Sequence, residues 1–333
     1  MIPLKLVFLG SDPIALPLLD WLGGEGRAVA QITAVFTQPD RAVGRGQKVQ
    51  PNAIKTWALA HALPLHQPER LTDEVRANLA ALNADAALVM AYGHILRDEF
   101  IATPRLGTLN LHTSLLPKYR GASPIQTAIA SGEHVTGVTL MRIVKKLDAG
   151  PIAGIEHVPI APLDTAVEIE AKLGAACVPL LARTLPRLGD GSLVFVAQDD
   201  QAATYCRKLE KDDGALDFTA PAAVLAARIN GLFPWPACNV EVNAQSIKFG
   251  LADALPSPGM SQPLNGDPGG PGVVLGSDGE GLLVATGDGV LRVRRLQRPG
   301  GRMLAAVEFL RGCPIPAGTP LPSRPMRPLA TTR

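Results

Sequence analysis

Two polar side chains near the end of a predicted strand could act on a single reacting group. Asn110 and His112 stand two residues apart in TLNLH, residues 108–112, and residues with that spacing project from the same side of a strand. An amide N–H and an imidazole together suit an oxyanion that develops during acyl transfer, because the imidazole can donate a hydrogen bond or move a proton. The spacing alone leaves a second interpretation open, in which both side chains only satisfy backbone groups at the strand end.

The elements that would hold this strand form an α/β pattern. Mostly apolar runs at residues 4–9, 84–93 and 106–112 alternate with helical segments, and such runs indicate a mostly parallel sheet covered on both faces. Residues 1–189 are therefore predicted to form a doubly wound, Rossmann-like domain. Ligands bind beyond the C-terminal ends of the strands in such sheets, and this is where the polar pair is expected.

The second half of the chain has a different pattern after a polar linker, which we place at residues 190–206. Short β-like pieces with Gly turns predict a smaller, OB-like β-barrel over residues 207–313. The pieces lie at residues 238–250, 272–277 and 281–297. We expect the Pro/Gly-rich stretch at 251–272 to form a surface loop and the Pro-rich tail at 314–333 to be poorly ordered.

Composition narrows the class of protein. Of 333 residues, 47% are hydrophobic and 19% are charged, which excludes wholesale disorder. The net charge of +2 means that nucleic-acid binding would depend on local basic patches. No apolar run reaches the length of about 18 residues that spans a bilayer, and the scattered cysteines fit reduced thiols in the cytoplasm and no zinc site.

A dinucleotide site is not supported by the sequence. The first predicted strand is followed by GSDPIALP, residues 10–17, in place of the glycine fingerprint, and Asp40 lies past the end of the second strand. The later Gly-Arg-Gly at 44–46 lacks the Lys-Ser/Thr of a phosphate-binding loop. We therefore expect no nicotinamide cofactor.

Two longer segments carry a family resemblance. NLHTSLLPKYRGASPIQ, residues 110–126, and TGVTLMRIVKKLDAGPI, residues 136–152, resemble the signature of the folate-dependent formyltransferases. The resemblance implies that Asn110, His112 and Asp148 form a catalytic trio and that no metal takes part. It also implies a folate site formed by Ser114, Leu115, Leu116, Pro117, Met90, Tyr92, Gly93 and Ile95. Taken alone, an Asp before Ala-Gly is commonly a turn former.

Further segments resemble the branch of this family that acts on a charged initiator tRNA. They are VFTQPDRAVGRGQKVQPNAIK, residues 35–55, and INGLFPWPACNVEV, residues 229–242. The resemblance implies formyl transfer from 10-formyltetrahydrofolate to the amino group of methionyl-tRNA, by a monomer in the cytoplasm. It makes Arg41, Arg45 and Lys48 phosphate contacts, although basic residues in a loop are ordinarily only solvated.

Charge in the C-terminal segment fits the same branch. Residues 285–333 contain nine arginines and two acidic residues. An excess of positive charge of this kind would favour binding to a polyanionic RNA. Without RNA, the same residues would be a solvated face and a loose tail.

Two other functions share parts of the pattern. A formyltransferase for a sugar nucleotide or a glycinamide nucleotide would keep the trio but would need neither the basic loop nor the barrel. A catalytically silent RNA-binding protein would not need the trio. The sequence also departs from the family at Thr113, where Gly is usual, and at Lys145 and Lys146 before the Leu-Asp pair. We expect Tyr119 and Arg120 either to cap the site or to lie on its solvated approach.

Overall fold

The computed structural model of the chain describes residues 2–43, 48–256 and 270–332. These residues form two compact units, each assembled from segments that are separate in the sequence. The first unit comprises Met1–Arg120, Gly137–Val158 and Glu170–Ala203, and the second comprises Gly121–Thr136, Pro159–Ile169 and Thr204–Arg333. The boundaries at 189, 206 and 313 remain a prediction from the sequence.

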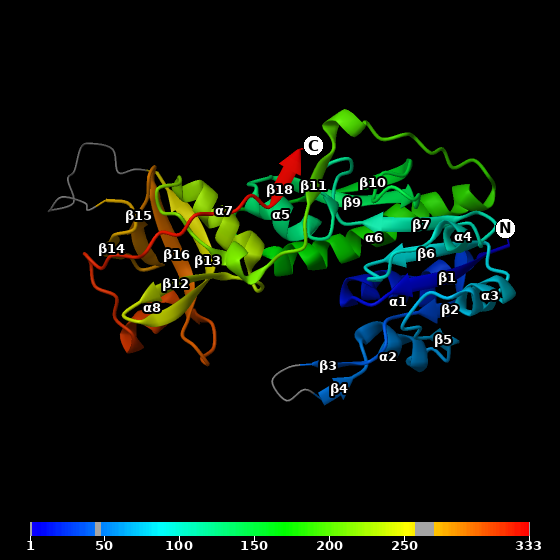
Figure 1. Cartoon of the computed structure of the whole chain (residues 1–333), viewed down its shortest axis with the longest axis horizontal. Helices are drawn as coiled ribbons and strands as arrows, with labels where there is room; N and C mark the ends of the chain where they lie inside the picture. The colour runs from blue at the N-terminus through cyan, green and yellow to red at the C-terminus, as the bar shows by residue number, and fades with distance from the viewer. Residues whose placement is uncertain (1, 44–47, 257–269, 333) are drawn as a thin grey trace. The chain divides into compact units, whose positions relative to one another are not determined.

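The first unit is built on a sheet that has seven strands in the described part of the chain, in the order β10-β9-β7-β6-β1-β2-β5 (Figure 1). The strands are β1 (Leu4–Gly10), β2 (Ala30–Phe36), β5 (Leu65–His66), β6 (Ala86–Met90), β7 (Thr108–His112), β9 (Val135–Arg142) and β10 (Ile152–Pro159). From β5 to β7 each neighbouring pair is parallel, whereas β9 runs antiparallel to β7. The predicted mostly parallel α/β domain is confirmed.

Helices connect these strands, and several begin at a capping side chain. Their bounds are α1 (Leu16–Gly23), α2 (Ala53–Ala60), α3 (Asp73–Ala81), α4 (Asp98–Ile101) and α6 (Ala166–Gly189). Asn52 accepts a hydrogen bond from the Lys55 N–H at 2.9 Å before α2, and the Thr72 hydroxyl accepts one from the Val75 N–H at 3.3 Å before α3. Each such cap stabilises a helix by about 1 kcal/mol.

The core beneath the site consists of buried strand residues. Every residue of β6 is buried, and only one residue of β1 is exposed. Phe36 is fully buried, with its ring stacked on His66 at a centroid distance of 4.4 Å and edge-on to Phe100 at 6.5 Å. Burial of one such ring contributes about 1.5–3 kcal/mol. The strands therefore offer a rigid base for side chains at their C-terminal ends.

The second unit contains an antiparallel sheet with helices. The strands are β12 (Cys238–Val242), β13 (Gln245–Leu255), β14 (Val274–Ser277), β15 (Leu282–Ala285), β16 (Val290–Gln297) and β17 (Leu304–Ala305), and the helices are α5 (Pro124–Ala130), α7 (Ala222–Leu232) and α8 (Ala306–Gly312). The sheet order is β12-β13-β16-β15-β14, and every pair is antiparallel. This half-barrel confirms the predicted second β domain. The predicted surface loop at 251–272 is wrong for residues 251–255, which continue β13 and pair with β16, and its part at 257–269 lies outside the described residues.

The expectation of a poorly ordered C-terminal tail is wrong. Strand β18 (Ala330–Thr332) pairs antiparallel with β11 (Thr204–Cys206), and β8 (Arg120–Gly121) is the third strand of this small sheet. Leu321 and Leu329 are buried in the core of the second unit, and the Ser323 hydroxyl accepts a hydrogen bond from the Phe218 N–H at 2.9 Å. The many prolines do not prevent order here, because the tail buries apolar side chains and its backbone finds partners.

No helix within the described residues is long and apolar enough to cross a membrane.

Candidate functional site

Strand β7 places Asn110 and His112 at the C-terminal edge of the parallel strands. It lies between β6, where Val89 is opposite Asn110, and β9, where Met141 and Thr139 are opposite Asn110 and His112. Asn110 is half-buried between buried neighbours, and in the described part of the chain its amide makes no hydrogen bond to protein. Its N–H groups therefore remain available to a ligand, and the role of Asn110 as a donor to an oxyanion stays a prediction.

The structure brings His112 and Asp148 together, although they are 36 positions apart in the sequence. His112 Nδ1 lies 3.7 Å from Asp148 Oδ2, and the side chains are only 7% and 13% exposed. The distance is longer than a direct hydrogen bond, as is common for catalytic contacts before substrate binds. The pair thus has the low exposure that strengthens electrostatic interactions.

The other imidazole nitrogen has a fixed partner. His112 Nε2 lies 2.9 Å from the carbonyl oxygen of Tyr119. Because a carbonyl can only accept, Nε2 must carry a hydrogen, and the nitrogen that can gain or lose a proton is Nδ1, on the side of Asp148. In the doubly protonated ring, each nitrogen faces an acceptor. The imidazole is therefore held with Nε2 on the Tyr119 carbonyl and Nδ1 towards the Asp148 carboxylate.

Asp148 sits in a turn with unusual backbone geometry. Its φ is +48°, a left-handed conformation that Asp tolerates better than most residues. The backbone of Gly150 packs so closely against Arg142 that a Cβ at position 150 would lie 1.7 Å from the Arg142 carbonyl oxygen. The Asp-Ala-Gly segment is indeed a turn, and the turn is what aims the carboxylate at His112.

The lysine that departs from the family pattern stabilises this turn. Lys146 Nζ lies 2.5 Å from Asp200 Oδ2, and Arg120 Nη1 lies 2.8 Å from Asp200 Oδ1. The hydrogen bonds from Lys146 and then Arg120 lower the pKa of Asp200 below its ordinary value. The carboxylate of Asp200 thus links Lys146 in the Asp148 turn to Arg120.

Sequence analysis missed the role of Arg120. Neither a cap nor a solvated approach describes it, because Arg120 is fully buried, and its guanidinium binds Gln198 as well as Asp200. Gln198 was not predicted at all. Its side-chain Nε2 donates to the carbonyls of Asp148 and Gly150 at 2.8 and 2.7 Å. The polar linker where it stands carries no motif that could have pointed to it.

The loop predicted to bind folate at 114–117 has a rigid backbone. The Ser114 hydroxyl donates to the Lys118 carbonyl at 2.7 Å, and Thr139 Oγ1 links the Ser114 carbonyl and the Leu116 N–H at 2.7 and 3.2 Å. Ser114 and Leu116 are buried, whereas Leu115 and Pro117 are half-buried. Any contact of Ser114 with folate remains a prediction, and its hydroxyl is already engaged within the loop.

The second predicted folate segment follows β6. Met90 is buried against Cys177, with a sulfur–sulfur distance of 3.9 Å, whereas Ile95 is 94% exposed. Tyr92 is buried, and in the described residues its hydroxyl has no hydrogen-bond partner. Burial raises the pKa of Tyr92 above its ordinary value, so the hydroxyl remains a neutral donor. Gly93 has a φ of +82°, which turns the chain here.

The basic segment predicted to contact RNA forms a hairpin, which projects from the first unit (Figure 1). Strand β3 (Arg41–Val43) pairs antiparallel with β4 (Lys48–Gln50). Arg41 and Lys48 are exposed, and Arg41 Nη2 donates to Gln38 Oε1 at 2.8 Å. Arg45 lies outside the described residues. At the base of the hairpin, hydrogen bonds from Gln67 and Lys55 lower the pKa of Asp40.

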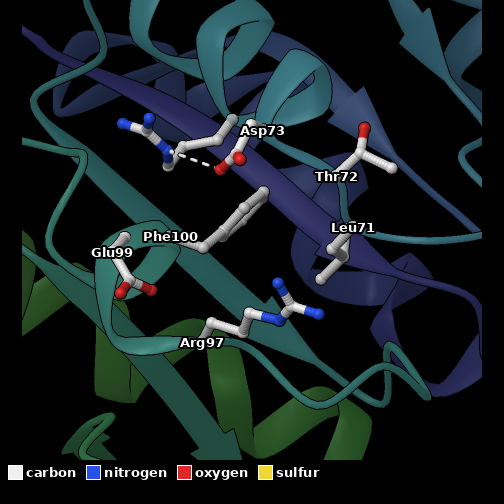
Figure 2. Close-up of a pocket in the computed structure, with 7 residues that line it drawn as sticks. Leu71, Thr72, Asp73, Arg97, Glu99 and Phe100 are labelled. Carbon is white, nitrogen blue, oxygen red and sulfur yellow. Dashed lines mark ion pairs between the residues drawn. The ribbon is translucent and has the colours of Figure 1, made fainter.

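A separate hollow of about 260 Å³ lies in the same unit (Figure 2). Phe100, Arg97 and Glu99 line it, together with Asp73 and Arg76, which form an ion pair at 3.7 Å. It contains none of the predicted site residues, and its charges of both signs indicate no particular ligand. No cluster of three or more metal-binding side chains occurs among the residues that the structure describes.

Comparison with known proteins places this architecture in a family. Residues 4–185 match the model of the formyl transferase family, and residues 208–314 match the model of its C-terminal domain. Curated relatives include the methionyl-tRNA formyltransferases of Pseudomonas syringae pv. syringae (strain B728a) and Pseudomonas entomophila (strain L48). Each is 41% identical over 303 residues, which are 91% of this chain and 92% and 94% of the relatives.

Solved structures share the fold at lower identity. HypX from Aquifex aeolicus in complex with tetrahydrofolic acid superposes with a TM-score of 0.60 at 15% identity, over 92% of this chain and 47% of HypX. The sugar 3N-formyltransferase WlaRD superposes with a TM-score of 0.60 at 16% identity, over 88% of this chain and 98% of WlaRD. The chain belongs to the formyl transferase family.

Proposed function

We propose that this formyl transferase moves the formyl group of 10-formyltetrahydrofolate to the α-amino group of methionyl-tRNA and so produces the initiator formylmethionyl-tRNA. The observation that carries the proposal is the pairing of His112 with Asp148, next to Asn110 on β7, in a chain 41% identical over most of its length to methionyl-tRNA formyltransferases. We further propose that the protein acts as a cytoplasmic monomer.

Formyl transfer to an amine does not need a strong base, but it does need the oxyanion of the intermediate to be stabilised. An α-amino group has a pKa of about 7.7–8.0, so a useful fraction is neutral near pH 7. Attack on the formyl carbon forms a new C–N bond and leaves an oxyanion and a protonated nitrogen. Collapse then breaks the C–N bond to the folate, whose departing nitrogen must receive a proton. The protein must therefore stabilise one negative charge and move one proton.

The trio can meet both demands. The Asn110 amide donates to the oxyanion, and the His112 ring donates a second hydrogen bond through its Nδ1–H, since Nε2 is held by Tyr119. Asp148, whose Oδ2 at 3.7 Å is too far from Nδ1 for a direct hydrogen bond, accepts the proton from the attacking nitrogen and gives it to the departing folate nitrogen. Preorganised donors of this kind contribute more than in water, because they do not have to reorient during the reaction.

The same proposed reaction requires a surface that binds folate and a surface that binds tRNA. For folate we propose the 114–117 loop and the segment from Met90 to Ile95. There the buried hydroxyl of Tyr92, which has no hydrogen-bond partner among the described residues, offers a polar contact, and the exposed Ile95 offers an apolar one. For tRNA phosphates we propose Arg41 and Lys48 on the exposed hairpin, together with Arg45, and the arginine-rich second unit.

A single assay tests this function against its rivals. The protein is mixed with 10-formyltetrahydrofolate and, in parallel, with methionyl-tRNA, an amino-sugar nucleotide or glycinamide ribonucleotide, and formyl product is measured. We expect product with methionyl-tRNA alone. Product with one of the small nucleotides would assign a different formyl transferase activity, and tRNA binding without any product would indicate a silent RNA-binding protein. Light scattering should give the mass of a single chain, and a dimer would contradict the monomer.

A further inference from the structure

The side-chain amide of Gln198 is saturated with hydrogen bonds. Its Nε2 donates to the carbonyl oxygens of Asp148 and Gly150 at 2.8 and 2.7 Å. Its Oε1 accepts from Arg120 Nη2 and Nε at 2.7 and 3.0 Å. Carbonyls only accept and a guanidinium only donates, so the amide can adopt just this one of its two orientations. Gln198 is a rigid link between the Asp148 turn and Arg120.

Arg120 anchors this link from inside the unit. Its side chain is fully buried, and Nη1 pairs with Asp200 at 2.8 Å. Asp200 in turn binds Lys146, two residues before Asp148. The turn is therefore held on both sides of the catalytic carboxylate, at Lys146 and at the Asp148 and Gly150 carbonyls.

The same short segment also orients the imidazole. The Tyr119 carbonyl holds His112 Nε2 at 2.9 Å, and Arg120 is the next residue in the chain. Tyr119 has a φ of +59°, a sparsely populated backbone conformation for a bulky residue, which persists only where the surrounding contacts enforce it. One dipeptide thus fixes His112 through its backbone and Asp148 through its side chain.

We infer that Arg120 and Gln198 are positioning residues, which set the separation of His112 and Asp148 without touching substrate. The inference rests on the proposed roles of that pair. It explains why an arginine is fully buried beside the site, since its five donors replace water for two partners. A misplacement of about 1 Å in a catalytic group can lower a rate about 10²-fold. Substitutions that disrupt this network should therefore lower kcat.

The test uses a substitution that breaks only one side of the link. In Gln198→Glu, the carboxylate can still accept from Arg120, but it repels the two turn carbonyls. We expect kcat for methionyl-tRNA to fall about 10- to 100-fold, while the KM values for both substrates change less than about threefold. Gln198→Met, which has similar size and no charge, should give a comparable loss if the Glu variant does not fold.

A matched control uses the same chemical change elsewhere. Gln31 is exposed at the start of β2, at the opposite end of the strands from the edge where Asn110 and His112 lie. Gln31→Glu should keep kcat within about twofold of wild type, with melting temperatures measured for both variants. An equal fall in kcat for the two variants would attribute the effect to general damage and overturn the inference.

A double-mutant cycle with Asp148→Asn separates positioning from a merely structural role. If Gln198 acts through the Asp148 carboxylate, adding Gln198→Glu to Asp148→Asn should lower kcat by less than about threefold, because coupled residues are not additive. Full multiplication of the two losses, or a wild-type kcat in Gln198→Glu alone, would overturn the inference. If the wild type does not formylate methionyl-tRNA, the proposed substrate fails, and the cycle is then measured on hydrolysis of the formyl-folate donor.

Discussion

The end of β7 and the β3–β4 hairpin belong to the same unit but use polar side chains in opposite ways. At His112 the groups are buried, and each ring nitrogen faces a defined acceptor. On the hairpin, Arg41 and Lys48 are exposed, and Arg41 makes one hydrogen bond to Gln38. Buried groups of fixed geometry suit the stabilisation of a transition state, whereas exposed cations suit contacts with phosphates that salt can screen.

The two regions should therefore respond to different perturbations. Changes at the end of β7 should lower kcat at any salt concentration, because its groups are shielded from mobile ions. Changes on the hairpin should weaken the use of methionyl-tRNA and lose their effect as salt rises. Substitutions at four places in the molecule test this contrast.

The largest effect is expected at His112. His112→Ala removes an oxyanion donor and the imidazole that Asp148 faces, so kcat should fall about 10³- to 10⁴-fold, at or above the upper end of the range for the loss of one oxyanion donor. Steady-state formylation of methionyl-tRNA measures it. The exposed His157 on β10 provides the control, since His157→Ala should be within about twofold of wild type. A loss of less than tenfold in His112→Ala would contradict the assignment.

Asn110 comes next. Asn110→Ala should lower kcat about 10²- to 10³-fold, the usual consequence of losing one oxyanion donor, while folate affinity in a fluorescence titration stays close to that of wild type. Asn110→Asp keeps the size but replaces the donor by a negative charge, and it should be at least as severe. Near-normal turnover in either variant would remove Asn110 from the site.

The hairpin should show an intermediate effect with a different signature. Arg41→Ala combined with Lys48→Ala should lower kcat/KM for methionyl-tRNA by about 1–3 kcal/mol in transition-state terms, the range for a lost charge-assisted hydrogen bond, and the defect should shrink between low and high salt. Arg27→Ala, at another exposed arginine of the same unit, is the control. A parallel fall in folate affinity would move the hairpin into the donor site.

The smallest effect is expected at Tyr92. Its hydroxyl is buried and unpartnered in the described residues, so Tyr92→Phe should leave the free energy of unfolding unchanged within about 0.5 kcal/mol or raise it. If folate supplies the missing partner, the KM for the donor should rise about 3- to 10-fold, as expected for one neutral hydrogen bond, with kcat preserved. An unchanged donor KM would exclude that contact.

Much of the fold could be predicted because it depends on local pattern. Apolar runs separated by helical segments predicted β1, β6 and β7 within a few residues of their observed bounds. The prediction for the C-terminal tail was wrong because it used only the proline content of the tail itself. The tail is ordered by residues far away in the sequence, as in the pairing of β18 with β11, and no residue near the tail indicates that pairing.

The candidate site also contains residues that the sequence predicted and residues that it did not. Strand periodicity places Asn110 and His112 on one side of β7, and family resemblance supplied Asp148. The network behind them could not be predicted, because Arg120 and Gln198 lie 78 positions apart in the sequence, and only the folded chain shows that the arginine is buried. A glutamine in a polar linker gives no sign that it donates hydrogen bonds to the carbonyls of the Asp148 turn.

If His112 and Asp148 work as one unit in formyl transfer, a double-mutant cycle on kcat will show that their effects are coupled. His112→Ala and Asp148→Asn are each measured with methionyl-tRNA and 10-formyltetrahydrofolate at saturation, alongside the combined variant. The 3.7 Å separation of Nδ1 and Oδ2 predicts that the double variant is little worse than the worse single variant, because either change alone disables the pair. Losses that multiply in full would show that the two residues act independently and would contradict the account.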